Sequence, residues 1–142
     1  WRCDELKPFP VIRAVRLDEP SVDTDRLATA RQWIDAAAAC GCLPAMALLD
    51  ASVSCGVKAG QFGGTGNIID WNSVAEVPIL PIPTTLAGGL TPDNVTAAIQ
   101  TTQASAVDTA SGVESAPGRK DSDLVRRFVN AAKQGFSGKP NA

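Results

Sequence analysis

A strand-like apolar segment followed by a helix-like segment recurs four times along this chain, and this alternation limits the possible folds more than any other feature. The apolar segments are rich in β-branched or aliphatic residues with little polar alternation, as in strands covered on both faces. They lie at 10–17, 44–51, 79–90 and 104–108, with the third strand placed at Thr84–Ala87. Four serial units of this kind predict a parallel sheet, because each return crossover between parallel strands needs a connecting helix.

The segments between these strands place apolar residues at helical spacing. Helices are expected over 24–40, near 70–74, over 91–102 and over 121–135. Gly41 is suited to follow the first helix as a left-handed cap, and Asp121 or Ser122 to cap the start of the last. The predicted fold class is therefore α/β.

The repeat length selects a particular α/β fold. A repeat of about 35 residues is close to one eighth of a (β/α)8 TIM barrel, which has roughly 250 residues. Residues 1–142 would then form about half of one barrel domain, with 136–142 as a flexible tail. A doubly wound open sheet is the rival fold. Because the first residue is Trp1 and not methionine, we expect the other half to have been lost upstream or to come from another chain.

Composition excludes several kinds of partner. The chain has 142 residues, 44% of them hydrophobic, and a formal net charge of -2 with its lysines and arginines scattered singly. No basic face for a nucleic-acid backbone is predicted. No apolar run approaches the roughly 20 residues of a membrane span, and the N-terminus does not resemble a secretory signal. We therefore expect no nucleic-acid or membrane partner and a cytoplasmic location.

The reactive side chains are few. The chain has no histidine, so proton chemistry must use carboxylates, cysteines or lysines. Cys40 and Cys42 are too close together for the usual redox or zinc spacing, and all four cysteines, which include Cys3 and Cys55, are interpreted as reduced structural thiols. No metal site is predicted.

Polar and glycine residues gather where the predicted strands end, which is where parallel α/β folds bind ligands. Glycines without a Cβ allow backbone N–H groups to approach an anion, and a serine adds a hydroxyl group. These residues are Asp50, Gly88, Gly89, Asp108, Ser111 and Gly112. Together they predict a phosphate site beside two carboxylates.

Structural explanations compete with this functional one. A Gly-Gly step before a helix is often only a tight turn. A carboxylate such as Asp50, closing an apolar strand, is costly to bury unless it is solvated, paired or protonated, which favours a general acid. For Asp108, hydrogen bonds to nearby backbone N–H groups are an equal alternative. The segment 118–121 is expected to be a solvated loop.

Four ordered motifs resemble one known family. The stretches LLDA, FGGTGNIIDW, LAGGLTPDNVTAAI and AVDTASGVESAPGRKD are similar to those of phosphoribosylanthranilate isomerase of tryptophan biosynthesis; they lie at 48–51, 62–71, 86–99 and 106–121. The resemblance implies a (β/α)8 barrel of which this chain supplies strands five to eight. It also implies isomerisation of N-(5-phosphoribosyl)anthranilate, an Amadori rearrangement of a phosphosugar that needs no metal or organic cofactor.

The resemblance assigns a role to each cluster. Asp50 matches the general acid that protonates the furanose ring oxygen, and Asp108 matches an aspartate near the sugar hydroxyl groups. Gly64 belongs to a loop that borders the active site. The phosphate-binding positions are matched by Gly88, Gly89, Ser111 and Gly112.

The departures from the family are equally informative. The family's general base is a cysteine on the first barrel strand, and none of the four cysteines here replaces it. Ala110 and Ile69 stand where a serine and an aromatic residue are usual. We therefore expect this chain alone to be inactive and to self-associate through open barrel edges. The alternatives are a non-catalytic phosphate-binding or interaction module and a different phosphosugar barrel enzyme.

Overall fold

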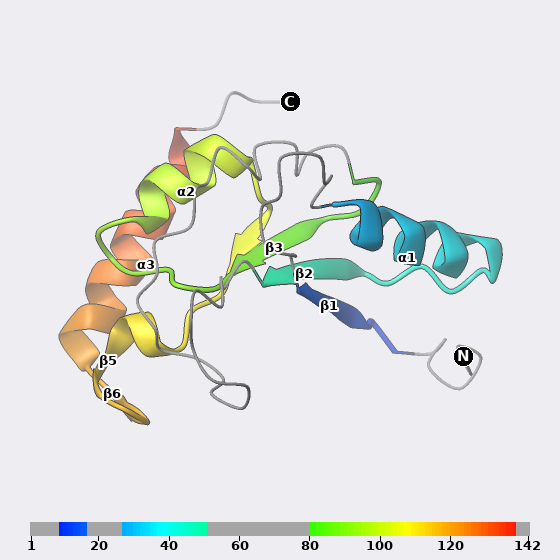
Figure 1. Cartoon of the computed structure of the whole chain (residues 1–142). Coiled ribbons are helices and arrows are strands. Elements are labelled where there is room, and N and C mark those ends of the chain that lie inside the picture. The colour runs from blue at the N-terminus through cyan, green and yellow to red at the C-terminus, as the bar shows by residue number, and fades with distance from the viewer. Residues whose placement is uncertain (1–8, 17–26, 51–79, 139–142) are drawn as a thin grey trace.

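The computed structural model describes residues 9–16, 27–50 and 80–138, and every structural statement below concerns these residues (Figure 1). The elements in chain order are β1 (Ile12–Arg16), α1 (Ala28–Ala39), β2 (Met46–Asp50), β3 (Thr84–Ala87), α2 (Val95–Thr102), β4 (Ala106–Val107), a 3-10 helix (Ser111–Val113), β5 (Glu114–Ala116), β6 (Arg119–Lys120) and α3 (Ser122–Ser137).

The first four strands form one parallel sheet in the order β1-β2-β3-β4. Each strand pairs with the strand that follows it in the sequence, as in successive strands of a barrel. A doubly wound sheet reverses its strand order at a switch point, and these four strands show no such reversal. The α/β class with a parallel sheet is confirmed, and the strand order disfavours the doubly wound alternative.

One face of the sheet carries the hydrophobic core. The side chains of alternate strand residues, including Val15, Leu49 and Leu86, are buried there. Helix α1 contributes Ala30 and Ile34 to the same core. The residues at helical spacing in this segment, Leu27, Ala30, Trp33, Ile34 and Ala37, are all buried or half-buried.

Helices α2 and α3 pack closely against each other beside β3 and β4 (Figure 1). Gly135 of α3 faces Ile99 of α2, and a Cβ atom at position 135 would lie only 2.9 Å from Ile99 Cδ1. The Thr96 hydroxyl group also donates to the Ala131 carbonyl oxygen at 2.8 Å. A small residue at this contact lets the two helices approach, and α2 in turn covers the sheet.

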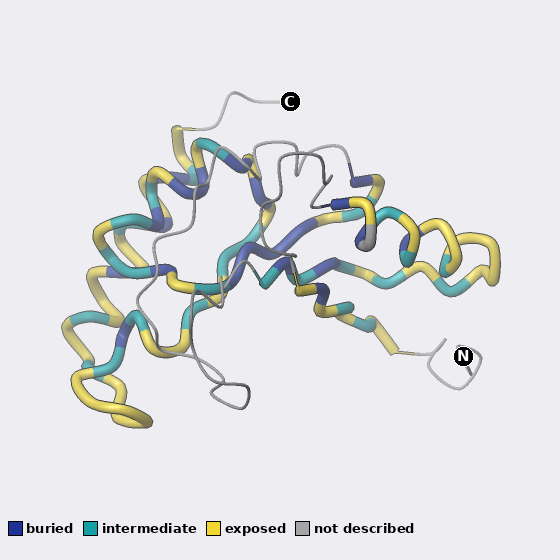
Figure 2. The backbone as a smooth tube through the Cα atoms, in the orientation of Figure 1, coloured by how far each residue is buried: buried dark blue, intermediate teal, exposed yellow. Residues whose placement is uncertain are grey.

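On β1 and β2 the other face of the sheet is less covered, whereas on β3 both faces are buried (Figure 2). Ile12, Ala14 and Arg16 alternate with the buried Val15 along β1 and are exposed, and Ile12 keeps 59% of its surface accessible. Met46, Leu48 and Asp50 of β2 are half-buried. Arg16 and Asp50, the last residues of β1 and β2, are the polar residues of this face and lie at the carboxyl edge of the sheet.

The predicted elements agree with the structure in order and type, with shifts at their ends. The last parallel strand contains two residues, Ala106–Val107, where five were expected. Helix α3 continues to Ser137, so 136 and 137 belong to a helix and not to the predicted tail. Gly41 follows α1 with φ +66°, as the predicted cap requires. The helix expected near 70–74 lies outside the described residues.

A short hairpin was missed by the sequence analysis. β5 and β6 pair in antiparallel fashion around Pro117 and Gly118, and β6 lies within 118–121, which was predicted to be a solvated loop. The Gly118 N–H group donates to Glu114 Oε2 at 3.0 Å, and Gly118 has φ +77°, which favours glycine. The Glu114 carboxylate thus orders this turn by accepting the Gly118 N–H group, whereas the charged residues that follow the turn had suggested only solvent exposure.

Candidate active site at the carboxyl edge of the sheet

The sheet register brings three of the predicted site segments to one edge. Asp50 ends β2 and pairs in register with Ala87, the residue before Gly88. Asp108 follows β4, and its N–H group donates to the Leu86 carbonyl oxygen at 2.8 Å. Parallel strands present their carboxyl ends together, so Asp50, the two glycines and Asp108 share this edge of the sheet.

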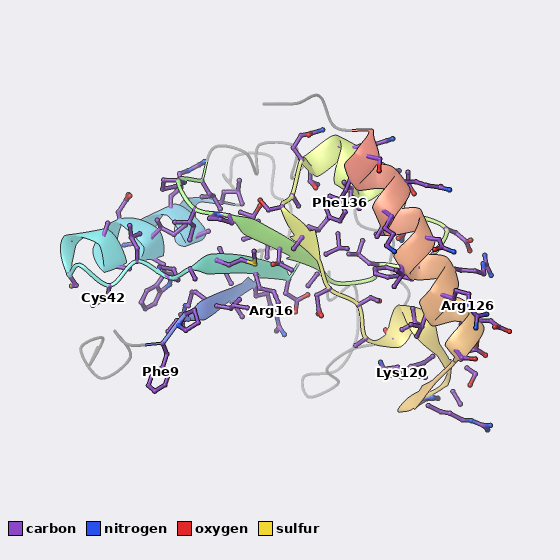
Figure 3. The ribbon with its side chains drawn as sticks, turned by 180° about the vertical axis from the view of Figure 1, so that it is seen from behind. Phe9, Arg16, Cys42, Lys120, Arg126 and Phe136 are labelled. Carbon is purple, nitrogen blue, oxygen red and sulfur yellow. The ribbon has the colours of Figure 1, made fainter. Side chains whose placement is uncertain are left out.

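Asp50 lies beside an arginine that the sequence analysis did not single out. It is half-buried, and its register partner on β1 is Arg16. Arg16 also closes its strand and is exposed, and Figure 3 labels it at the end of β1. A charged residue close to the end of the apolar segment 10–17 was the available signal, because similar reasoning had selected Asp50. The edge therefore carries charges of both signs.

The glycine pair after β3 adopts a conformation that favours glycine. Gly88 and Gly89 have φ values of +91° and +64°. Asn94 holds this turn from below: its Nδ2 group donates to the Gly89 carbonyl oxygen at 3.0 Å, and its Oδ1 atom accepts the Thr91 N–H at 2.8 Å. The turn is thereby anchored to the start of α2.

The second predicted phosphate segment contacts the first directly. Gly112 lies against the backbone of Leu90, where any Cβ atom at position 112 would overlap the Leu90 carbonyl oxygen. The Thr109 hydroxyl group donates to the same oxygen at 2.7 Å. The two glycine-containing segments, 88–90 and 109–113, therefore form one continuous backbone surface. The sequence analysis did not identify Thr109 and Asn94, whose side chains hold these two segments through hydrogen bonds.

A lysine and a glutamate support the 3-10 helix from the hairpin side (Figure 3). Lys120 Nζ donates to the Ala110 carbonyl oxygen at 2.6 Å and pairs with Glu114 Oε1 at 2.8 Å. The hydrogen bond from Lys120, followed by that from the Gly118 N–H group, holds the pKa of Glu114 below the ordinary value of a glutamate. Glu114 is thus a stable anion at neutral pH.

This arrangement can bind an anion and move a proton. Two glycine-containing turns lie together at the carboxyl edge, and backbone N–H groups of such turns are suited to bind anions. Asp108 is exposed at the same edge and can accept hydrogen bonds from hydroxyl groups. Asp50 supplies a carboxyl group one and two strands away from these features. Acid–base chemistry on a phosphorylated polyol is consistent with such a set of groups.

The remaining candidate residues lie elsewhere. Cys40 and Cys42 follow α1 and precede β2, at the amino edge of the sheet and away from Asp50. Gly64, Cys3 and Cys55 lie outside the described residues. Within the described ranges, no group of three or more cysteine, aspartate or glutamate residues could hold a metal ion. The helices described in this structure are all too short or too polar to cross a membrane.

The parallel βα arrangement and its glycine-rich carboxyl edge define an α/β protein of the TIM-barrel class. The family model of N-(5'-phosphoribosyl)anthranilate (PRA) isomerase matches residues 3–131. The chain belongs to that family.

Curated relatives and solved structures carry the same family name. The N-(5'-phosphoribosyl)anthranilate isomerase of Haloarcula marismortui is 52% identical over 90 residues, which cover 63% of this chain and 42% of the relative. The isomerase of Myxococcus xanthus is 40% identical over 124 residues, covering 87% and 51%. The phosphoribosyl anthranilate isomerase structure from Thermotoga maritima superimposes with a TM-score of 0.66 at 30% identity, covering 92% and 55%. This chain spans about half the length of the relatives it matches.

Proposed function

We propose that this chain supplies the second half of a (β/α)8 barrel, with β1 to β4 as barrel strands five to eight, and that the barrel isomerises N-(5'-phosphoribosyl)anthranilate in tryptophan biosynthesis. The observation that carries the proposal is the meeting of Asp50, the Gly88–Gly89 turn and the 109–113 segment at one sheet edge. Family membership supports the same conclusion.

Asp50 is proposed as the general acid. A proton from its carboxyl group passes to the furanose ring oxygen as the C1–O bond breaks, and the nitrogen lone pair forms an iminium ion (a protonated imine). A base then removes the proton at C2, which yields an enamine that tautomerises to the ketone product. Asp50 suits the first step because it ends a strand at the ligand-binding edge while remaining half-buried.

The substrate phosphate is proposed to bind between the two glycine-containing segments, and Asp108 to bind a sugar hydroxyl group. One structural relative, at 26% identity with a TM-score of 0.65, is a phosphoribosyl anthranilate isomerase in complex with reduced 1-(o-carboxyphenylamino)-1-deoxyribulose 5-phosphate. That ligand has a phosphate, a polyol and an aromatic carboxylate. The phosphate half of such a molecule matches the groups along this edge, and Gly64 is proposed to border the same site.

The base that removes the C2 proton is not assigned to a residue of the described ranges. By resemblance it would be a cysteine on the first barrel strand, and neither Cys40 nor Cys42 lies at the Asp50 edge. We therefore propose that the other barrel half supplies this base and that the 142 residues alone do not catalyse the reaction. A cytoplasmic location also stays a prediction.

The test uses the protein that carries this chain, expressed at its natural full length. Asp50→Asn should lower kcat by about 10²- to 10⁴-fold, because an amide cannot protonate the ring oxygen. Affinity for the reduced product analogue should change little, as measured by calorimetry. Full turnover in the variant would remove Asp50 from the mechanism. Binding of phosphate without any conversion by the unaltered protein would support the non-catalytic alternative.

A further inference from the structure

The hairpin formed by β5 and β6 reaches back to the segment proposed to bind phosphate. Lys120 lies on β6, ten residues beyond Ala110, and its ammonium group contacts the carbonyl oxygen of Ala110 at 2.6 Å. The same ammonium group pairs with Glu114, whose side chain is only 16% exposed. The Lys120 ammonium group therefore links β6 to both ends of the 3-10 helix: to Glu114, which follows it, and to Ala110, which precedes it.

The contact at Ala110 determines the direction of a neighbouring donor. The peptide bond between Ala110 and Ser111 is planar and, like the other peptide bonds described here, not cis. In a trans peptide the N–H group points opposite to the carbonyl group. When Lys120 draws the Ala110 carbonyl toward the hairpin, the Ser111 N–H group must point away from the hairpin. Orientation of this donor is thus tied to a side chain nine residues further along.

We propose that Lys120 is a positioning residue for the phosphate site, which it serves by holding the Ala110–Ser111 peptide in the orientation that directs the Ser111 N–H group toward the anion. This inference rests on the proposed function, because it assigns the support for the same phosphate site. Two of the three N–H donors of the Lys120 ammonium group are engaged by Ala110 and Glu114, and the role proposed here is to position the peptide and not to bind the phosphate.

Two features distinguish this role from simple closure of the hairpin. Ion pairs with an exposed partner contribute little to stability, and the Lys120 side chain is 51% exposed. The ammonium group also contacts a carbonyl oxygen outside β5 and β6, which hairpin closure does not require. Glu114 fixes the ammonium group at this position and is itself fixed by the Gly118 N–H group.

The experiment compares Lys120→Met, Lys120→Arg and the control Lys133→Met in the natural full-length protein. Lys120→Met keeps the apolar stem and removes the ammonium group, so KM for phosphoribosylanthranilate should rise about tenfold, the effect of one lost hydrogen bond, with kcat nearly unchanged. The inhibition constant of inorganic phosphate should rise in parallel, and that of anthranilate, which has no phosphate, should not. Lys120→Arg should restore most of the affinity, because its guanidinium group can donate to both partners.

Lys133 is an exposed lysine on α3, and its replacement should leave both constants unchanged. An unchanged KM and phosphate inhibition constant in Lys120→Met would overturn the role of Lys120, as would a fall in kcat alone. If Lys120→Met fails to fold, Glu114→Gln provides the test, since a weaker partner for Lys120 should still raise KM. An unchanged KM there would contradict the proposal. An unaltered protein that neither converts the substrate nor responds to phosphate would instead contradict the proposed function.

Discussion

Single residues at the carboxyl edge are constrained mainly by backbone contacts. Gly112 is the strongest case, because its Cα lies where a side chain would collide with the carbonyl oxygen of Leu90. That oxygen also accepts the Thr109 hydroxyl group, so it cannot move aside without breaking a hydrogen bond. A glycine is required here because the two loops touch at this position. The same close approach is what brings the two glycine-containing segments together at the proposed anion site.

Gly112→Ala is therefore expected to separate the two segments. Overpacking of this kind typically costs about 1–3 kcal/mol of stability, and here it should also weaken phosphate binding. Isothermal titration with inorganic phosphate and a thermal melt measure the two effects. Gly138→Ala is the matched control, because a Cβ atom there meets its nearest neighbour at an ordinary 3.6 Å. Equal behaviour of the two variants would show that the contact with Leu90 is easily relaxed.

The ionised state of Glu114 should make stability depend on pH. Lys120, then the Gly118 N–H group, lower the pKa of Glu114 in the folded protein relative to the unfolded chain. The resulting stabilisation is fully present above the unfolded pKa and is lost as the pH falls through the folded one. The difference in unfolding free energy between the natural protein and Glu114→Gln should thus shrink on acidification below the usual glutamate range. Denaturant titrations across that range measure it, and a pH-independent difference would contradict the assignment.

At the scale of elements, the start of α3 depends on one side chain. Asp121 Oδ1 accepts the N–H groups of Asp123 and Leu124 at 2.9 and 3.0 Å. The sequence predicted a cap at Asp121 or Ser122, and the structure places it at Asp121, since a capping residue before an amphipathic helix is a local signal. Asp121 directly follows Lys120, the last residue of β6, so the cap fixes the point at which the chain passes from the hairpin into α3.

Asp121→Ala should destabilise the protein by about 1 kcal/mol through loss of this cap, which lowers Tm by about 2–4 °C in a chain of this size. Asp123→Ala is the control in the same turn. It keeps the cap and removes an exposed ion pair with Arg126 and a negative charge in the first turn, each worth a few tenths of a kcal/mol. Calorimetric melts of the two variants provide the comparison. A larger loss in Asp123→Ala would show that charge, and not capping, stabilises this end.

The elements and strand-end residues were predictable because their signals are local or follow from the sheet. Apolar runs revealed β1 to β3, and the rule that parallel strands present their carboxyl ends together placed Asp50 beside Gly88. Contacts made across loops were not predictable. Lys120 was interpreted as part of a solvated loop because nothing in its neighbourhood indicates the Ala110 carbonyl oxygen. Such contacts depend on where the folded chain brings distant backbone atoms.

For the molecule as a whole, one face of the sheet is covered, and the other is less covered along β1 and β2. β1 and β4 are its outer strands, and within the described ranges each pairs with one neighbour only. The less covered face of β1 and the loops beside it expose large apolar side chains, with Phe9 at 66%, Ile12 at 59% and Leu43 at 53%. Exposed strand edges and apolar faces together favour association with another chain.

The 142 residues expressed by themselves should therefore self-associate and show no isomerase activity. Sedimentation velocity over a range of concentrations should reveal dimers or larger species. Ile12→Thr should reduce this association, since it replaces an exposed apolar side chain on β1 with another β-branched residue that suits a strand. Val129→Thr is the control, because Val129 is a similarly sized exposed residue on α3, at 42%. Adding the other barrel half that we propose, as a separate chain, should lower self-association and produce some turnover. A monodisperse monomer that isomerises phosphoribosylanthranilate unaided would contradict this account, because the proton at C2 would then be removed by a base within these residues.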